Sequence, residues 1–204
     1  MFHIVDVDNT LVFTDELNTA GYVHALACVA LEPRKVVPRI TREIVQEWYP
    51  QLSEYDLAHM ATLKQAYVES HLDMSQLNDS VARVLSTYGS ECCALWTAAN
   101  PERVRMLLKH HMVTDYRAIR FSNKTETDIA HAVQDFCVLF DCKPEELCFH
   151  EDNPEVINQL RKLGMTVMAV EANAVAYSSS KKKNREIKMP FFRNNYLKAY
   201  FMRW

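Results

Sequence analysis

Five short apolar runs, separated by segments with helical spacing, constrain the fold of this chain most strongly. Each run has three to five residues, and several are rich in β-branched or aromatic side chains, as buried strands are. The predicted strands are residues 2–5, 92–96, 118–121, 147–149 and 166–170. Helical patterns lie between the later runs, at residues 101–111, 127–140 and 154–163. Strands that alternate with helices form a parallel sheet covered on both faces, so we predict a doubly wound, Rossmann-like α/β fold.

One stretch, residues 15–78, interrupts this alternation. It contains no convincing strand, and its apolar residues follow the spacing of three amphipathic helices. Residues 79–88 then have the pattern of a helix that leads back into the second strand. We therefore predict an α/β core made of residues 1–14 and 79–177, with an inserted α-helical cap at residues 15–78.

The C-terminal segment, residues 178–204, differs from the rest in charge. It holds eight Lys or Arg and a single acid, Glu186, for a net charge of +7, whereas the rest of the chain carries −10. Its aromatic residues alternate with the basic ones. Packing on the core or on a second copy of the chain is the favoured interpretation, and binding to a membrane surface or stacking on RNA stays open. We treat the segment as a basic, aromatic extension.

Composition and overall charge exclude several classes of protein. The chain has 204 residues and a net charge of −3, which gives no general reason to expect nucleic acid as a partner. No apolar run is long enough to cross a bilayer, and acids begin at Asp6, too early for a signal peptide. We therefore expect a cytoplasmic protein. The six cysteines form no CxxC pair, so we expect small buried hydrophobes rather than zinc or redox groups.

Reactive side chains follow four of the predicted strands at the point where each strand ends. They are Asp6 and Asp8, Thr97, Lys124, and the neighbours Glu151 and Asp152. In an open parallel sheet, ligands bind beyond the carboxyl ends of the strands, so we expect these groups to gather at one edge. Carboxylates crowded around one lysine need a metal to offset their repulsion, and an all-oxygen site suits Mg²⁺. Mg²⁺ is the one cofactor predicted.

Four motifs in this order resemble those of the haloacid dehalogenase-like superfamily of phosphohydrolases, in the branch with a helical cap. The matching segments are residues 6–12, 95–100, 124–129 and 149–153. That branch includes β-phosphoglucomutase and phosphoglycolate phosphatase. The resemblance covers residues 1–172, and the cap matches only in position and helical character.

The resemblance implies a role for each matched residue. Asp6 would be the nucleophile that forms an aspartyl-phosphate, and Asp8, two residues on and on the same strand face, would be the general acid and then the base. Thr97 would bind a phosphoryl oxygen, and Lys124 would offset negative charge. The implied metal ligands are Asp6, the backbone carbonyl of Asp8, Asp152 and, directly or through water, Glu151.

An acid at the position of Asp8 separates reaction types within the superfamily, because a halide leaving group needs no proton. The resemblance therefore favours phosphoryl transfer, and we predict a Mg²⁺-dependent hydrolase of a small phosphate monoester. A phosphosugar mutase with the same chemistry and a non-catalytic binding protein on this scaffold are the alternatives. The expected partner is a small phosphorylated metabolite, which the sequence does not identify. Whether the chain forms a homodimer is left open.

Three positions depart from the family pattern. Asn9 and Val156 stand where relatives often have Gly, and Phe13 stands where many capped relatives have Asp. Asn tolerates unusual backbone angles, so the first departure is compatible with the same loop. Phe13 lies at the predicted hinge between core and cap, and it argues against transferring any relative's substrate to this chain.

Two further features receive a structural interpretation. The cap holds a basic cluster, which we interpret as a solvated helix edge rather than a ligand contact. Its members are Arg34, Lys35, Arg39 and Arg42. His150, beside the end of the fourth strand, is interpreted as a packed or hydrogen-bonded histidine rather than a proton carrier.

Overall fold

The computed structural model describes residues 1–171, and the predicted C-terminal extension at residues 178–204 lies outside them. The strands are β1 (Phe2–Val5), β2 (Val12–Phe13), β3 (Gln76–Leu77), β4 (Cys93–Thr97), β5 (Ile119–Phe121), β6 (Leu147–Glu151) and β7 (Thr166–Ala169). The α-helices are α1 (Asp15–Cys28), α2 (Arg42–Trp48), α3 (Glu54–Ser70), α4 (Asp79–Cys92), α5 (Pro101–His110), α6 (Glu126–Phe140) and α7 (Pro154–Lys162). Two short 3₁₀ helices, η1 (Leu72–Met74) and η2 (Pro144–Glu146), complete the elements. None of these helices is long and apolar enough to cross a membrane.

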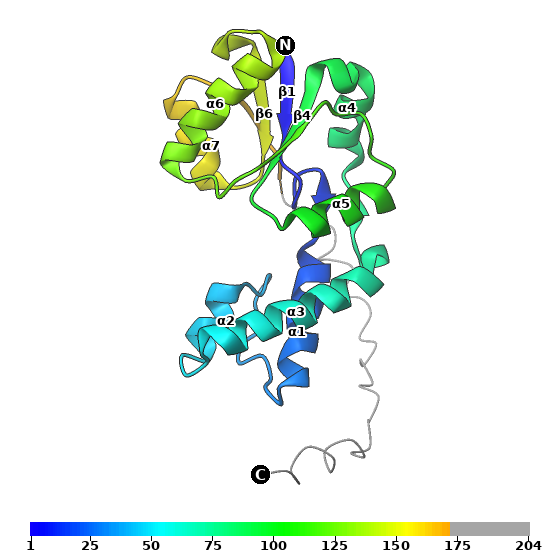
Figure 1. The fold of residues 1–204 in the computed structure, drawn as a ribbon, viewed down its shortest axis with the longest axis vertical. Coiled ribbons are helices and arrows are strands. Elements are labelled where there is room, and N and C mark those ends of the chain that lie inside the picture. Colours follow the sequence, from blue (N-terminus) through cyan, green and yellow to red (C-terminus); the bar gives the residue numbers. More distant parts are fainter. Residues whose placement is uncertain (172–204) are drawn as a thin grey trace. The chain divides into compact units, whose positions relative to one another are not determined.

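Five strands form one parallel sheet in the order β5-β4-β1-β6-β7 (Figure 1). The central strand β1 pairs with β4 on one side and β6 on the other, so that His3 lies opposite both Cys93 and Cys148. Because all five strands run in the same direction, their carboxyl ends share one edge of the sheet. The doubly wound α/β fold predicted from the sequence is confirmed.

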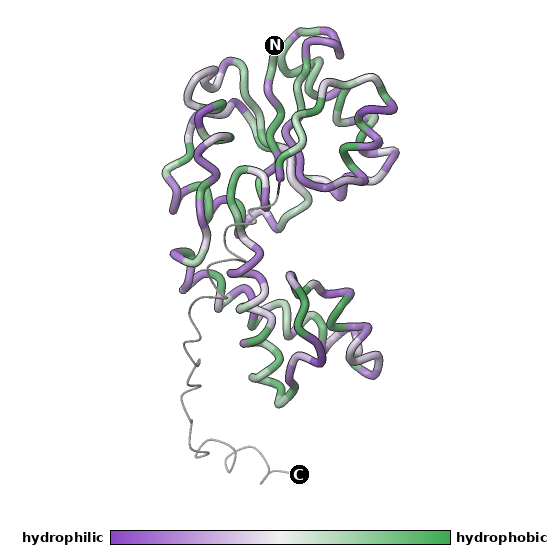
Figure 2. The backbone as a smooth tube through the Cα atoms, turned by 180° about the vertical axis from the view of Figure 1, so that it is seen from behind, coloured by the Kyte–Doolittle hydropathy of each residue, from purple (hydrophilic) through white to green (hydrophobic). Residues whose placement is uncertain are grey.

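Helices cover both faces of this sheet, with α4 and α5 on one side and α6 and α7 on the other (Figure 1). Successive residues of β1 face opposite sides: Val5 packs in one cluster with Leu107 of α5, and Ile4 packs in another with Ile129 and Phe136 of α6. Figure 2 shows the strands largely in green between helices that alternate between green and purple. Burial of each large apolar side chain stabilises the fold by roughly 1.5–3 kcal/mol.

Local sequence sets the ends of the core helices. Asn100 caps α5 by accepting two N–H hydrogen bonds of the first turn through Oδ1, and Pro101 occupies the first helical position. Helix α7 ends just before Gly164, whose φ of 78° is the left-handed conformation that glycine adopts easily. Helix α4 is broken at Gly89, with φ 68° and ψ 179°, next to the predicted end at residue 88.

The three helices between β2 and β3 pack on one another around an apolar cluster of their own. Leu26 of α1, Val45 and Trp48 of α2 and Met60 of α3 belong to it. Gly21 in the middle of α1 allows α3 to approach closely, because a Cβ atom there would lie 3.0 Å from Cγ of Lys64. These helices therefore have an apolar cluster of their own, and Leu17 of α1 and Val68 of α3 also pack in the cluster that contains Val5 of β1.

A pair of two-residue strands brackets this helical segment. Strand β2 pairs antiparallel with β3, with Val12 opposite Leu77 and Phe13 opposite Gln76. The prediction that residues 15–78 contain no strand is therefore wrong at Gln76–Leu77. A strand of two residues shows no alternation along the sequence, so its pattern gave no signal.

Candidate active site

A buried lysine joins two carboxylates at the carboxyl edge of the sheet. Nζ of Lys124 donates to Oδ1 of Asp6 and to Oε2 of Glu151, both at 2.6 Å. Asp6 directly follows β1, Glu151 ends β6, and Lys124 lies in the loop between β5 and α6. The lysine side chain is 7% exposed, and its Nζ also lies 4.9 Å from the ring centroid of Trp96. Charged hydrogen bonds shielded from water in this way are strong and fix the geometry of all three groups.

Burial governs the protonation of this group. It raises the pKa of Asp6 to about 7, although Lys124 opposes the shift. It also raises the pKa of Glu151, and it raises that of Asp152 to about 6, with the charge of Asp6 adding to the effect. Burial by itself would lower the pKa of Lys124, but the Asp6 and Glu151 carboxylates outweigh it and raise that pKa. The lysine therefore stays charged, while burial holds the pKa of each of the three carboxyl groups above its ordinary value.

The oxygen atoms of Asp6, Glu151 and Asp152 form a donor set for a hard cation. One carboxylate oxygen from each residue lies within 4.8 Å of the other two. Three carboxylates beside the single ammonium of Lys124 leave an excess of two negative charges when all are ionised. Oxygen donors with excess negative charge fit a hard divalent ion, so these residues fit Mg²⁺ by their chemistry.

The three carboxylates are not equally free to bind a metal. Both oxygens of Glu151 already accept hydrogen bonds, one from Lys124 and one from the N–H of Asn153 at 3.1 Å. Asp152 accepts from Oγ1 of Thr10 through Oδ1 at 3.1 Å, which leaves its other oxygen available. Glu151 is therefore better placed to hold Lys124, or a metal-bound water, than to be a direct ligand.

Thr97 ends β4 and is almost fully buried. Its Oγ1 accepts a hydrogen bond from the N–H of Ala99 at 3.1 Å. Because the oxygen accepts there, the hydroxyl proton can be donated to another acceptor, as binding of a phosphoryl oxygen requires. The structure makes no hydrogen bond between Thr97 and the carboxylate cluster.

The carboxylate of Asp8 has different partners from those of the other acids. Its Oδ2 accepts from Nη2 of Arg103 at 2.5 Å, and its Oδ1 accepts from Oγ1 of Thr14 at 2.7 Å. Arg103, on α5, also donates from Nη1 to Oδ1 of Asn18 on α1 at 2.6 Å. The sequence did not single out Arg103, because nothing along the chain signals a contact between residues 95 positions apart. This arginine connects Asp8, α5 and α1 in one hydrogen-bonded group.

Asn9 explains how the loop after β1 is held. Its φ is 60°, the left-handed conformation in which Asn is tolerated better than most residues. Its Nδ2 donates to Oδ1 of Asp15 at 2.8 Å, and its Oδ1 accepts from the N–H of Thr14 at 3.1 Å. The backbone of Asn9 therefore adopts the left-handed conformation that Gly would also allow, and its side chain fixes the start of α1.

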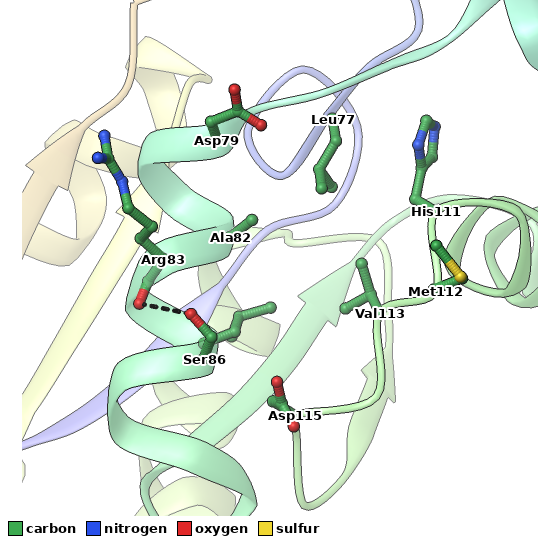
Figure 3. Close-up of a pocket in the computed structure, with 10 residues that line it drawn as sticks. Leu77, Asp79, Ala82, Arg83, Ser86, His111, Met112, Val113 and Asp115 are labelled. Carbon is green, nitrogen blue, oxygen red and sulfur yellow. Dashed lines mark hydrogen bonds between the residues drawn. The ribbon is translucent and has the colours of Figure 1, made fainter.

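A separate surface hollow of about 500 Å³ lies between α4 and the segment that follows α5 (Figure 3). Its lining includes Leu77, His111 and Asp115, and Oγ of Ser86 donates to the carbonyl of Arg83 at 3.2 Å within it. None of the six site residues predicted from the sequence lines this hollow. It is therefore a different feature from the carboxylate cluster.

Comparison with solved structures identifies the fold. A predicted phosphoglycolate phosphatase from Haemophilus somnus matches with a TM-score of 0.66 and 17% identity over 82% of this chain and 84% of that one. A haloacid dehalogenase-like family hydrolase from Streptococcus pneumoniae matches with a TM-score of 0.60 and 15% identity over 85% and 88% of the two chains. The chain has the haloacid dehalogenase-like fold. A superfamily hydrolase of subfamily IA from Geobacter sulfurreducens agrees, with a TM-score of 0.59 and 15% identity over 82% and 85%.

The haloacid dehalogenase-like fold is the one that the four motifs predicted. No protein-family model matches the sequence, and no curated protein matches it either. At such low identity the likeness to solved structures shows the fold, and the roles of the individual residues stay predictions. The structure brings Asp6, Lys124, Glu151 and Asp152 together, whereas the Asp8 carboxylate is held by Arg103 and Thr14.

Proposed function

We propose that this chain is a Mg²⁺-dependent phosphohydrolase that transfers a phosphoryl group from a small phosphate monoester to Asp6. The observation that carries the proposal is Lys124, held at 2.6 Å between Asp6 and Glu151 with Asp152 close by, where strands β1 and β6 end. The names of the similar solved structures, a predicted phosphoglycolate phosphatase among them, support the same reaction class.

Asp6 is suited to be the nucleophile. Lys124 holds its Oδ1, which leaves Oδ2 to attack phosphorus. The new bond forms between this oxygen and phosphorus while the bond from phosphorus to the ester oxygen breaks, which gives an aspartyl-phosphate and an alcohol. Lys124 and the hydroxyl of Thr97 then stabilise the negative charge on the phosphoryl oxygens.

Asp8 is suited to manage the proton of the leaving group, after a change of partner. Both carboxylate oxygens of Asp8 have partners in this structure, one in the Arg103 guanidinium and the other in the Thr14 hydroxyl, so one of these contacts has to open before Asp8 can reach the leaving group. In the reaction, Asp8 gives its proton to the departing ester oxygen, and it then removes a proton from the water that hydrolyses the aspartyl-phosphate. Opening of the contact between Asp8 and Arg103 is therefore part of the proposed cycle.

Asp6, Asp152, the carbonyl of Asp8 and, through water, Glu151 would hold Mg²⁺, which would supply positive charge to neutralise the phosphoryl group. Residues 15–78 are proposed as the cap that selects the substrate, on a core of residues 1–14 and 79–177. The separate apolar cluster of α1, α2 and α3 supports this division. The hydrogen bond from Arg103 to Asn18 gives the cap a direct link to the Asp8 group.

Phosphate release tests the proposal. An aryl phosphate and a panel of metabolite phosphates are assayed with Mg²⁺ and with chelator, for the wild type and Asp6→Asn. The exposed Asp73→Asn removes the same charge outside the site and is the matched control. Turnover that needs Mg²⁺, persists in Asp73→Asn and disappears in Asp6→Asn supports the hydrolase. Transfer of phosphate between sugar positions without release would favour a mutase, and a folded, metal-bound protein with no turnover would favour a binding protein.

A further inference from the structure

A second group of potential metal ligands lies on the same two strands, before their carboxyl ends. His3 of β1 and Cys148 of β6 are opposite each other in the parallel register, and His150 follows two residues after Cys148. Residues two apart on one strand share a face, so all three side chains lie on the same side of the sheet. One ligand atom from each lies within 4.8 Å of the other two.

The group is buried and held in place. His3 and Cys148 are 7% and 3% exposed, and Nδ1 of His3 lies 3.0 Å from Nε2 of His150 in a hydrogen bond. The ring of Tyr88 on α4 lies against His3, with centroids 4.2 Å apart. A hydrogen bond between two ring nitrogens requires at least one ring to be neutral, which is the form that binds metals.

Packing alone does not explain one atom of this group. Histidines buried for packing normally have both ring nitrogens hydrogen-bonded. Nε2 of His3 is buried, and it has no hydrogen-bond partner among residues 1–171. The pair therefore does not satisfy itself, and Cys148 is a free thiol at the same place.

We propose that His3, Cys148 and His150 bind a Zn²⁺ ion, with one nitrogen from each ring, the sulfur, and a fourth position open to water. Two nitrogens and a thiolate are donors that zinc prefers and Mg²⁺ does not. On binding, the thiol proton of Cys148 leaves to solvent and the imidazoles stay neutral.

This site is independent of the proposed phosphatase chemistry, because it uses none of the carboxylates or Lys124. Its effect follows from the strands that it connects. His3 is three residues before Asp6, and His150 directly precedes Glu151. A zinc ion bound by β1 and β6 would stabilise the native strand pair by mass action, since the unfolded chain keeps these residues far apart.

Cobalt titration tests the site without an activity assay. The metal-free, reduced protein is titrated with Co²⁺ in saturating Mg²⁺, which occupies the oxygen cluster. We expect one equivalent to give a sulfur-to-cobalt charge-transfer absorption with the strong visible bands of four-coordinate cobalt, and Zn²⁺ to remove both. Cys148→Ser should lose the charge-transfer band and weaken Zn²⁺ binding by more than about 100-fold, beyond the roughly 10–100-fold effect of groups that only support a ligand.

The matched control is Cys137→Ser, a half-buried cysteine on α6 outside the cluster, which should keep the absorption. His3→Gln gives a second route in case Cys148→Ser folds poorly. Zn²⁺ should raise the Tm of the wild type and not that of this variant, whose fold is checked by circular dichroism. A folded wild type with no charge-transfer band, or the same band in Cys148→Ser, would overturn the proposal.

Discussion

The strand pair β1–β6 carries two groups of buried polar side chains, and the two groups are stabilised in different ways. At its carboxyl end, Asp6 and Glu151 share the ammonium of Lys124. A few residues earlier, His3 and His150 meet each other and Cys148 with no charged partner among them. Where the strands end, a loop can bring a lysine to the carboxylates, whereas on the face of the sheet a polar group has to be neutral or bind an ion. The two groups therefore differ in whether a loop brings a charged partner to them.

Removal of the proposed nucleophile, Asp6, should have the largest effect. Asp6→Asn keeps the shape of the side chain but cannot form an aspartyl-phosphate, so the rate of phosphate release should fall by about 10⁴–10⁶-fold. Steady-state assays with an aryl phosphate measure this, beside Asp73→Asn as the control. Retention of more than a tenth of the wild-type rate would show that the carboxylate end of the strand pair is not the reactive one.

Removal of the cation should have the next largest effect. Lys124→Met leaves Asp6 and Glu151 buried without their ammonium and takes away a donor to the phosphoryl group, so kcat should fall by about 10²–10³-fold. Lys124→Arg, which keeps the charge in a different shape, should recover part of the loss. A normal kcat in Lys124→Met would show that the role of this lysine is structural.

The contact between Asp8 and Arg103 should have a moderate effect on stability. Arg103→Met, Asp8→Asn and the double variant form a double-mutant cycle, with a coupling free energy expected at about 1–3 kcal/mol, since both side chains are almost buried. For a chain of this size each kcal/mol lowers Tm by about 2–4 °C. Thermal unfolding of the metal-free proteins measures the cycle, and additive effects would show that the ion pair contributes nothing.

The contributions of the two groups to stability should change with pH in opposite directions. Burial raises the pKa of Asp6 to about 7, so the native protein keeps a proton that the unfolded chain has released, and stability falls as pH rises from about 4 to 7. Burial lowers the pKa of His150 to about 4, so that group loses stability as pH falls from about 6.5 to 4.

Asp6→Asn separates the two contributions, because an amide resembles the protonated acid. In the metal-free protein it should raise Tm near pH 7 and have little effect near pH 4. Mg²⁺ should reduce this difference, because it takes the place of the bound proton in the wild type. Tm values across the pH series, with chelator and with Mg²⁺, measure both effects. An equal change in Tm at every pH would contradict the assignment.

The sequence was most informative where one residue determines local structure. The helices predicted at residues 101–111 and 154–163 match α5 and α7, because Asn100 and Pro101 set the start of α5 and Gly164 follows the end of α7. The apolar runs predicted all five strands of the sheet to within two residues, because buried parallel strands are almost uniformly apolar. Strands β2 and β3 were missed because a strand of two residues carries no periodicity.

The sequence was least informative where a contact depends on which strands become neighbours. Asp6 and Glu151 were predicted to meet because both follow strand ends. Arg103 was missed because it reaches Asp8 and Asn18 from a helix face. The pairing of His3 with His150 was missed for a related reason: it depends on the register of β1 against β6, which spans 147 positions. Residue spacing along the chain does not contain that information.

The pairing of β2 with β3 has a consequence for how this chain can change. The points where the helical segment leaves and rejoins the core, Phe13 and Gln76, are opposite each other in an antiparallel pair, with Cα atoms about 5 Å apart. A short turn can connect such positions. The segment between them can therefore change in length or sequence while β2 and β3 stay paired, so that in the proposed enzyme substrate selection can evolve separately from the phosphoryl-transfer groups.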